Sequence, residues 1–133
     1  MRAIVLDASA LVAAVADDGP AGRWAEELMR SEALAAPHLA LAEAGNILRR
    51  LVLAGSLTDN EASLAHSDLL DCDLELFPYA PFAERIWELR GAVTIYDACY
   101  VALAEALGAP LATLDRKLSR APGPRCRFLA PPR

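Results

Sequence analysis

Four acidic residues stand in unusually apolar or small-residue surroundings, and carboxylates gathered in one place can hold a divalent cation. They are Asp7, Glu43, Asp97 and Asp115. Two carboxylates about 4 Å apart repel by roughly 4 kcal/mol at an effective dielectric constant of about 20, so a cluster without a cation destabilises the fold or raises its pKa values. Mg²⁺ and Mn²⁺ prefer oxygen ligands and reverse that repulsion. Such an ion also activates water and neutralises a scissile phosphate. The four acids therefore predict a metal-dependent hydrolase, with a nuclease as the favoured class.

Two of these acids end short apolar runs. Asp7 follows Ala3–Leu6, and Asp115 follows Leu111–Leu114. Runs of this kind are typical of strands buried on both faces of a parallel sheet. Ligands of open α/β sheets bind outside the carboxyl ends of the strands. We therefore expect both acids at the edge of the sheet where ligands bind.

The strand-end acids also have a structural interpretation, because Asp is a good N-cap for a following helix. Asp7 could cap the helix after it, although Ser9 could serve equally well, and Asp115 could cap a short turn. Thr113 lies two residues before Asp115, on the same face of the strand, as expected of a residue that supports a metal ligand. The sequence leaves both roles open.

The other two acids are expected on helices. Glu43 lies at the margin of an apolar helical stripe and could instead pair with Arg50. Asp97 comes three residues after Thr94 in a variant of the capping box, where its charge also favours the helix dipole. A helix N-terminus can nonetheless point a carboxylate into the crevice of a sheet, so capping and function can coexist.

The rest of the chain alternates strands and helices without a linker or repeat. We expect strands over 3–6, 33–36, 74–77, 111–114 and 125–129, and helices over 9–16, 21–30, 37–53, 58–70, 82–89 and 94–107. Pro37 is expected to open the third helix, Thr58 to begin a capping box and Gly108 to cap the last helix. This order predicts a single α/β domain over 1–133 with a mainly parallel sheet.

Composition narrows the function further. The net charge of −5 argues against a non-specific nucleic-acid coat protein, yet residues 116–133 hold six basic and no acidic residues. This basic segment suits a phosphate-bearing substrate or a solvated terminus. Three widely spaced cysteines predict reduced thiols rather than a zinc site or disulfides. No uncharged stretch reaches the roughly 18 residues of a membrane span, so we expect a soluble cytoplasmic protein.

Four segments, taken together, resemble the PIN-domain family and specifically the VapC-type toxins of bacterial toxin–antitoxin pairs. They are Val5–Leu11, His38–Asn46, Tyr96–Ala104 and Ala112–Asp115. Each motif alone is weak, but four in this order and spacing are specific. The resemblance covers essentially the whole chain.

The resemblance implies a PIN-like three-layer α/β/α sandwich with a short, mainly parallel sheet. It also implies a Mg²⁺- or Mn²⁺-dependent endoribonuclease, a homodimer, and a VapB-type antitoxin whose C-terminal segment covers the acidic pocket. Carried over by position, Asp7, Glu43, Asp97 and Asp115 become the metal ligands. We assign Ser9, Thr113 and Asn46 as polar residues that support these ligands, and RNA contacts to Arg49, Arg50, Arg116 and Lys117.

Two other classes of protein compete with this interpretation. An enzyme with an aspartyl nucleophile usually has a second acid two residues after the first, where this chain has Ser9. A non-catalytic PIN-like protein-interaction module would tolerate replacement of its acids by Asn or Gln. Intact acids at all four positions favour the nuclease.

Overall fold

A computed structural model describes residues 2–30 and 33–133, and a five-stranded sheet lies at the centre of this described part. The strand order is β3-β2-β1-β4-β5, and each pair of neighbours is parallel. The strands are β1 (Ala3–Leu6), β2 (Ala33–Pro37), β3 (Leu74–Phe77), β4 (Leu111–Ala112) and β5 (Phe128–Leu129). The sheet is therefore short and wholly parallel in the described residues, as the apolar runs predicted.

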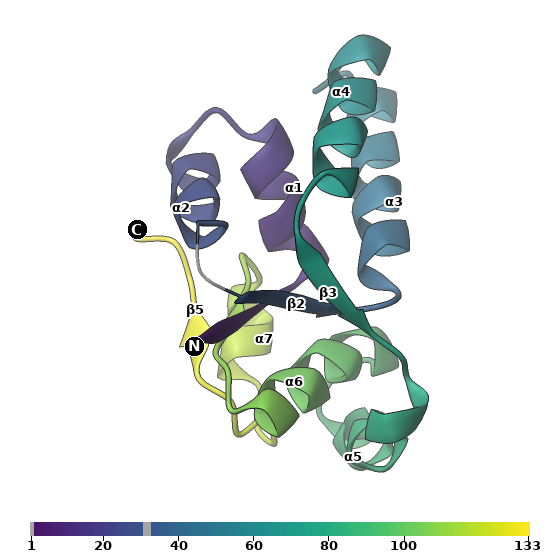
Figure 1. Cartoon of the computed structure of the whole chain (residues 1–133), viewed down its shortest axis with the longest axis vertical. Coiled ribbons are helices and arrows are strands. Elements are labelled where there is room, and N and C mark those ends of the chain that lie inside the picture. The colour runs from purple at the N-terminus through teal and green to yellow at the C-terminus, as the bar shows by residue number, and fades with distance from the viewer. Residues whose placement is uncertain (1, 31–32) are drawn as a thin grey trace.

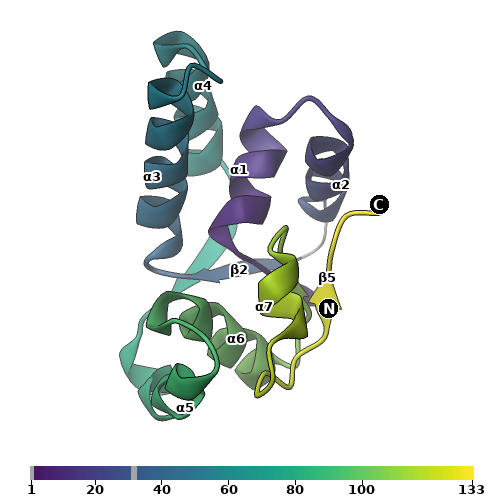
Figure 2. The same ribbon diagram turned by 180° about the vertical axis from the view of Figure 1, so that it is seen from behind.

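Helices cover both faces of this sheet (Figures 1 and 2). The α-helices are α1 (Ala8–Ala16), α2 (Pro20–Leu28), α3 (Ala40–Leu53), α4 (Asp59–Leu70), α5 (Ala83–Glu88), α6 (Ile95–Leu107) and α7 (Arg116–Arg120). Two 3₁₀ turns, η1 (Ala80–Phe82) and η2 (Leu89–Gly91), flank α5. Helices α1 to α4 lie on one side, with α3 and α4 standing out as a pair, and α5 and α6 lie on the other. The predicted three-layer α/β/α fold is confirmed.

The strand order creates a crevice beside the central strand. From β1 the chain builds one half of the sheet through β2 and β3, and later builds the other half through β4 and β5. Such a reversal is the place where open α/β sheets bind ligands. Leu6 pairs with Ala112, so the residues that follow β1 and β4 emerge next to each other at the carboxyl edge.

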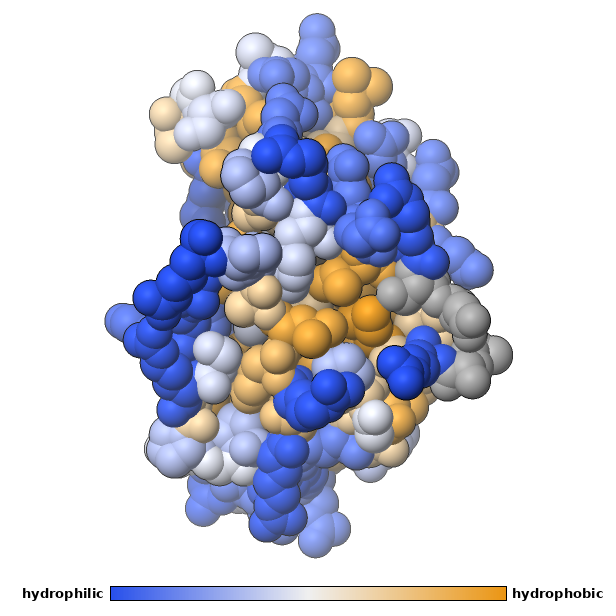
Figure 3. All heavy atoms as spheres, turned by 90° about the vertical axis from the view of Figure 1, so that its left-hand side faces the viewer, coloured by the Kyte–Doolittle hydropathy of each residue, from blue (hydrophilic) through white to orange (hydrophobic). Residues whose placement is uncertain are grey.

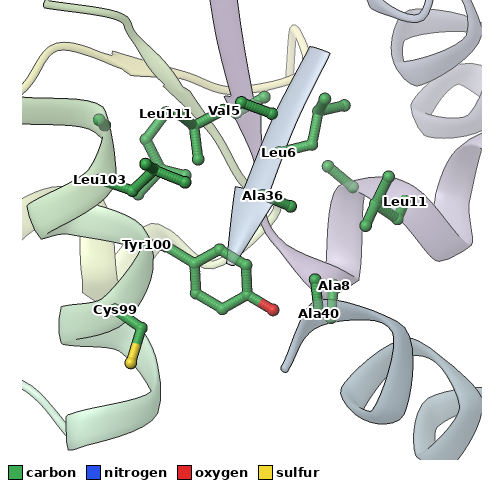
Figure 4. Packing of buried hydrophobic residues seen from close by; sticks show 14 of the residues in the cluster. Val5, Leu6, Ala8, Leu11, Ala36, Ala40, Cys99, Tyr100, Leu103 and Leu111 are labelled. Carbon is green, nitrogen blue, oxygen red and sulfur yellow. The ribbon is translucent and has the colours of Figure 1, made fainter. Parts of the chain in front are cut away.

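The core lies between the sheet and α6 on one side, and between the sheet and α1 and α3 on the other (Figure 4). All residues from Ala98 to Ala104 are buried, so this part of α6 is apolar around its whole circumference. Tyr100 is among the largest fully buried side chains. Its hydroxyl points toward the starts of α1 and α3, near Ala8 and Ala40 (Figure 4).

The predicted helix start at Pro37 is wrong. Pro37 is buried as the last residue of β2 and pairs with Phe77, and His38 N donates to the Phe77 carbonyl at 2.8 Å. Helix α3 begins only at Ala40, after Leu39, which makes no side-chain cap bond. Pairing with β3 and burial extend β2 to Pro37, although by local preference alone this proline would open a helix.

The last two strands are shorter than predicted, because β4 and β5 each contain two residues. Thr113 N still donates to Leu129 O at 3.0 Å, but the chain then turns away from the sheet. The predicted caps are confirmed: Thr58 forms a complete capping box, and Gly108 ends α6 in the left-handed conformation at φ 61°.

The surface on the side of α2, β5 and the C-terminus has an apolar area at its centre, bordered by hydrophilic side chains (Figure 3). Phe128 and Leu129 of the edge strand β5 are half-buried and pack against the core. Within the described ranges, no helix is both long and apolar enough to cross a membrane.

Candidate active site

Asp7 is fixed where β1 ends and α1 begins. It is the N-cap of α1, and its Oδ1 accepts a hydrogen bond from Ala10 N at 3.0 Å. Only 6% of the residue is exposed. Burial raises the pKa of Asp7 above its ordinary value, more than hydrogen bonds from Ser9, Thr113 and Ala10 lower it, and the charge of Asp115 raises it further. Asp7 therefore caps α1 and also lies at the end of β1, where the sequence predicted a metal ligand.

Two hydroxyls join Asp7 to the end of β4. Ser9 Oγ donates to Asp7 Oδ1 at 2.6 Å and accepts from Leu114 N at 3.0 Å. Thr113 Oγ1 donates to Asp7 Oδ2 and accepts from Asp115 N at 2.9 Å. The carboxyl ends of β1 and β4 are therefore tied together through side chains, and both oxygens of Asp7 are held in a defined orientation.

Asp115 is exposed at the start of α7. Its Oδ1 accepts from Lys117 N at 2.9 Å and from Leu118 N at 3.2 Å, which makes it the N-cap of this short helix. Its backbone position is fixed by Thr113, which contacts Asp7 with the same hydroxyl. Asp115 is thus placed beside the crevice by the residues that orient Asp7.

Asp97 lies half-buried in the first turn of α6, where Asp97 N donates to Thr94 Oγ1 at 3.1 Å. Burial raises the pKa of Asp97 above its ordinary value, and the charges of Asp115, Asp7 and Glu43 raise it further. Three segments far apart in the sequence therefore bring their carboxylates within electrostatic reach of α6. This mutual repulsion is the electrostatic signature expected of a site for a cation.

Glu43 accepts a hydrogen bond from the hydroxyl of Tyr100, with the two oxygens 2.6 Å apart. Burial, and then the bond to Glu43, raise the pKa of Tyr100 above its ordinary value. Arg50, the alternative partner from the sequence, forms none of the ion pairs found in the described residues. Sequence reasoning missed Tyr100, although it lies three residues after Asp97 on the same helix.

The donor set suits a hard divalent cation in its chemistry, because it consists of carboxylates. Within residues 2–30 and 33–133, no three Asp, Glu, His or Cys side chains form a ready-made group around an ion. Asp7 is locked by hydrogen bonds, whereas Asp97 and Glu43 are half-buried and Asp115 is exposed. Burial raises the pKa of Asp97 and three neighbouring carboxylates raise it further, and this accumulation of negative charge favours a cation among these residues.

The basic and amide residues predicted to support the site are spread over several surfaces. Arg50 lines a groove of about 410 Å³ together with Ser9, whereas Arg49 lines a separate groove of about 600 Å³ along α3 and α4. Asn46 is exposed on α3. The structure therefore brings Arg50, but not Arg49, into a groove that reaches the acidic site.

Two further basic residues follow Asp115 directly on α7. Arg116 Nη2 donates to the Pro131 carbonyl at 3.1 Å, which ties this guanidinium to the C-terminal segment. Lys117 is exposed. Of the two, Lys117 has the greater freedom to meet a substrate.

Comparison with known proteins assigns the chain to a family. The family model described as "PIN domain" matches residues 4–124. "Ribonuclease VapC1" of Mycobacterium tuberculosis is 41% identical over 129 residues, covering 96% of this chain and 97% of the relative. The crystal structure of PAE2754 from Pyrobaculum aerophilum has a TM-score of 0.70 and 28% identity, covering 96% of this chain and 83% of that chain. VapBC2 from Rickettsia felis, bound to a DNA fragment from its promoter, has a TM-score of 0.65 at 18% identity over 98% of this chain and 99% of that chain, a similarity of fold.

Proposed function

The chain belongs to the PIN-domain family, as a VapC-type member, and from this premise we propose that it is a metal-dependent endoribonuclease. We propose further that it acts as the toxin of a VapBC-type pair. One observation carries the proposal: at the carboxyl edge of a parallel sheet, burial raises the pKa of Asp97, and the charges of Asp115, Asp7 and Glu43 raise it further. Such repulsion has no benefit for folding and suits a site that receives a cation with its phosphate substrate.

Asp7, Glu43, Asp97 and Asp115 would hold Mg²⁺ or Mn²⁺, directly or through water. When bound, the ion would supply a water of lowered pKa and neutralise charge on the phosphodiester. The chain's own residues do the positioning. Ser9 and Thr113 orient both oxygens of Asp7, and the Tyr100 hydroxyl orients Glu43.

RNA would approach along surfaces whose basic side chains compensate the negative charge of the acidic site. Arg50 lies in the groove that includes Ser9, and Lys117 is exposed two residues after Asp115. These cations can contact phosphates on either side of the bond to be cut. Arg49 and Arg116 would contribute less, because Arg49 lines a different groove and Arg116 contacts Pro131.

We propose a VapB-type antitoxin as the protein partner, a homodimer as the assembly and the cytoplasm as the location. The antitoxin is supported by the similarity to "Ribonuclease VapC1" and by the shared fold of VapBC2. The apolar groove of about 410 Å³ beside Ser9 offers a surface for a partner segment that would cover the site. Copurification of this chain with the product of an adjacent gene tests that assignment.

The decisive experiment is cleavage of a total-RNA pool by wild-type protein and by Asp7→Asn, with Mg²⁺ or Mn²⁺ and with EDTA. We expect discrete fragments from wild type with metal, and none from the variant or with EDTA. The variant should fold, as checked by circular dichroism, because loss of the charge relieves repulsion at a buried position. Undiminished metal-dependent cleavage by folded Asp7→Asn would overturn the assignment of this ligand.

A non-catalytic interaction module is the alternative function. It predicts that folded, metal-loaded wild type cuts no RNA in the pool. It also predicts that replacing all four acids with their amides leaves partner binding unchanged. The nuclease instead predicts that the amide variants lose cleavage while they keep the fold.

A further inference from the structure

A small aromatic cavity lies next to the acidic site along the same edge of the sheet. Its volume is about 250 Å³, and its walls include His38, Leu39, Phe77, Tyr79, Phe82 and Cys99. Phe77 is the last residue of β3, and the cavity also reaches Pro37, the last residue of β2. The acidic site follows β1 and β4, so the two sites occupy neighbouring strand ends at the carboxyl edge.

Two residues of the cavity lining, Leu39 and Cys99, lie close in the chain to residues of the acidic site. Leu39 directly precedes α3 and lies four residues, about one turn, before Glu43. Cys99 lies on α6 between Asp97 and Tyr100, and the hydroxyl of Tyr100 donates to Glu43 at 2.6 Å. Figure 4 places Cys99 beside Tyr100 on α6, with the two side chains turned in different directions. The cavity is therefore built in part on the same two elements that carry Glu43 and Asp97.

We infer that this aromatic cavity receives one unpaired nucleobase of the RNA, beside the phosphate held at the acids. The inference rests on the proposed ribonuclease function and names a substrate-binding subsite for it. Single-stranded RNA is commonly recognised through bases that are splayed out and stacked on aromatic side chains. The rings of Phe77 and Phe82 meet edge to face at 6.2 Å, and Tyr79 is 47% exposed, so a ring at the mouth remains free to stack.

Size and charge favour a base over the other ligands. A cavity of about 150 Å³ already holds benzene, so about 250 Å³ suits a single heterocycle and is too small for a partner helix. The described lining includes no Asp, Glu, Lys or Arg. The lining therefore offers a phosphate no Lys or Arg, whereas a neutral base loses little on entering an apolar cavity.

The test combines a change in the protein with a change in the RNA. The probe is a short single-stranded RNA that spans a cleavage position mapped with wild-type protein, and binding is measured in the Asp7→Asn background. We expect Tyr79→Ala to weaken binding by about 5- to 150-fold, the range for loss of one stacked base, and Tyr79→Phe to bind like the parent. An abasic nucleotide next to the mapped cleavage position should weaken binding by a similar factor. With this abasic RNA, Tyr79→Ala should cause no further loss of affinity.

Trp87→Ala is the matched control, because Trp87 is an aromatic residue 59% exposed on α5 and outside this cavity. It should leave RNA binding unchanged. Full retention of affinity by folded Tyr79→Ala, or an equal loss for intact and abasic RNA, would overturn the inference while leaving the nuclease intact. A shift in oligomeric state by Tyr79→Ala without a change in RNA affinity would assign the cavity to a second copy of this chain. If wild type cuts no RNA, the proposed function fails and this inference fails with it.

Discussion

The two ends of α6 hold carboxylates in opposite electrostatic settings. Near its start, Asp97 is surrounded by Asp7, Glu43 and Asp115, and burial and these charges raise its pKa. Near its end, Glu105 is gripped by Arg85, whose Nε donates to Oε1 at 2.7 Å and whose Nη2 donates to Oε2 at 3.1 Å. Burial raises the pKa of Glu105, but Arg85 and Arg125 N outweigh it and lower the pKa below its ordinary value.

The difference separates Glu105, whose ion pair stabilises the fold, from Asp97, whose charge is not neutralised by the fold. Glu105 also accepts from Arg125 N at 2.7 Å, and Arg85 Nη2 donates to the Gly123 carbonyl at 2.9 Å. This cluster ties the C-terminal segment to α5 and α6. Asp97 gains no such cationic partner among the ion pairs of the described residues, and its proposed role as a ligand for a cation would account for its position.

Paired substitutions at the two ends of α6 should dissociate activity from stability. Asp97→Asn is expected to lower RNA cleavage by at least about 10³-fold, the scale of removing one member of a catalytic set, with no loss of folded protein. Glu105→Gln should cleave RNA at the wild-type rate at a temperature where it is folded. Initial rates with saturating Mg²⁺ measure both. Equal losses of activity in the two variants would mean that α6 carries no functional asymmetry.

Tyr100 connects the acids near the start of α6 with the core, because its hydroxyl contacts Glu43. Tyr100→Phe removes only the hydroxyl that donates to Glu43 at 2.6 Å. Loss of a residue that orients a metal ligand typically costs about 10- to 100-fold in metal affinity or activity, and we expect a loss of that size. Direct Mn²⁺ titration by calorimetry measures affinity without relying on turnover. An unchanged Mn²⁺ affinity in a folded variant would restrict Tyr100 to packing.

The sequence predicted where the acids lie better than it predicted the side chains that hold them, and their role as metal ligands stays a prediction. Asp7 and Asp115 follow apolar runs, and strand ends of a parallel sheet converge, so local patterns were sufficient. Tyr100 and Glu43 lie 57 residues apart, and no periodicity joins them. The same holds for Arg85 and Glu105, which are 20 residues apart on different helices. Such contacts depend on how α5 and α6 pack, which one sequence does not specify.

Local rules also failed where tertiary contacts outweighed them. Pro37 has the preference of a first helical residue, yet pairing with Phe77 places it at the end of a strand. The strand predicted over 111–114 ends after Ala112, where the hydroxyl of Thr113 donates to Asp7 and accepts from Asp115 N as the chain leaves the sheet. In both cases the decisive partner comes from a distant segment.

At the structural end of α6, Glu105→Gln should lower the free energy of unfolding by about 1–3 kcal/mol, because Arg85 and Arg125 N lose a charged acceptor and one of its two oxygens. The side chain of Glu105 is 16% exposed, so water compensates only in part. Urea denaturation of metal-free protein measures the change. The matched control is Glu88→Gln, because Glu88 meets the same Arg85 at 3.4 Å but its side chain is 56% exposed. We expect it to cost at most about 1 kcal/mol, as for surface ion pairs.

The pH dependence of stability should have opposite signs at the two ends of α6. A raised pKa means that folding favours the protonated acid, so the contribution of Asp97 is present below its ordinary pKa of 3.8 and is lost as pH rises through the higher folded value. Asp97→Asn should therefore gain stability relative to metal-free wild type as pH rises above that range.

The lowered pKa of Glu105 gives the reverse dependence. Its contribution is present above the ordinary pKa of 4.5 and is lost as pH falls through the folded value, so the deficit of Glu105→Gln should shrink in acid. Urea titrations of wild type and both variants across this range, with EDTA present, measure the two differences. Because each variant is compared with wild type at the same pH, titrating groups that do not interact with the replaced acid cancel. Parallel pH trends in the two differences would show that the carboxylates share one electrostatic setting, and the contrast between the two ends of α6 would not hold.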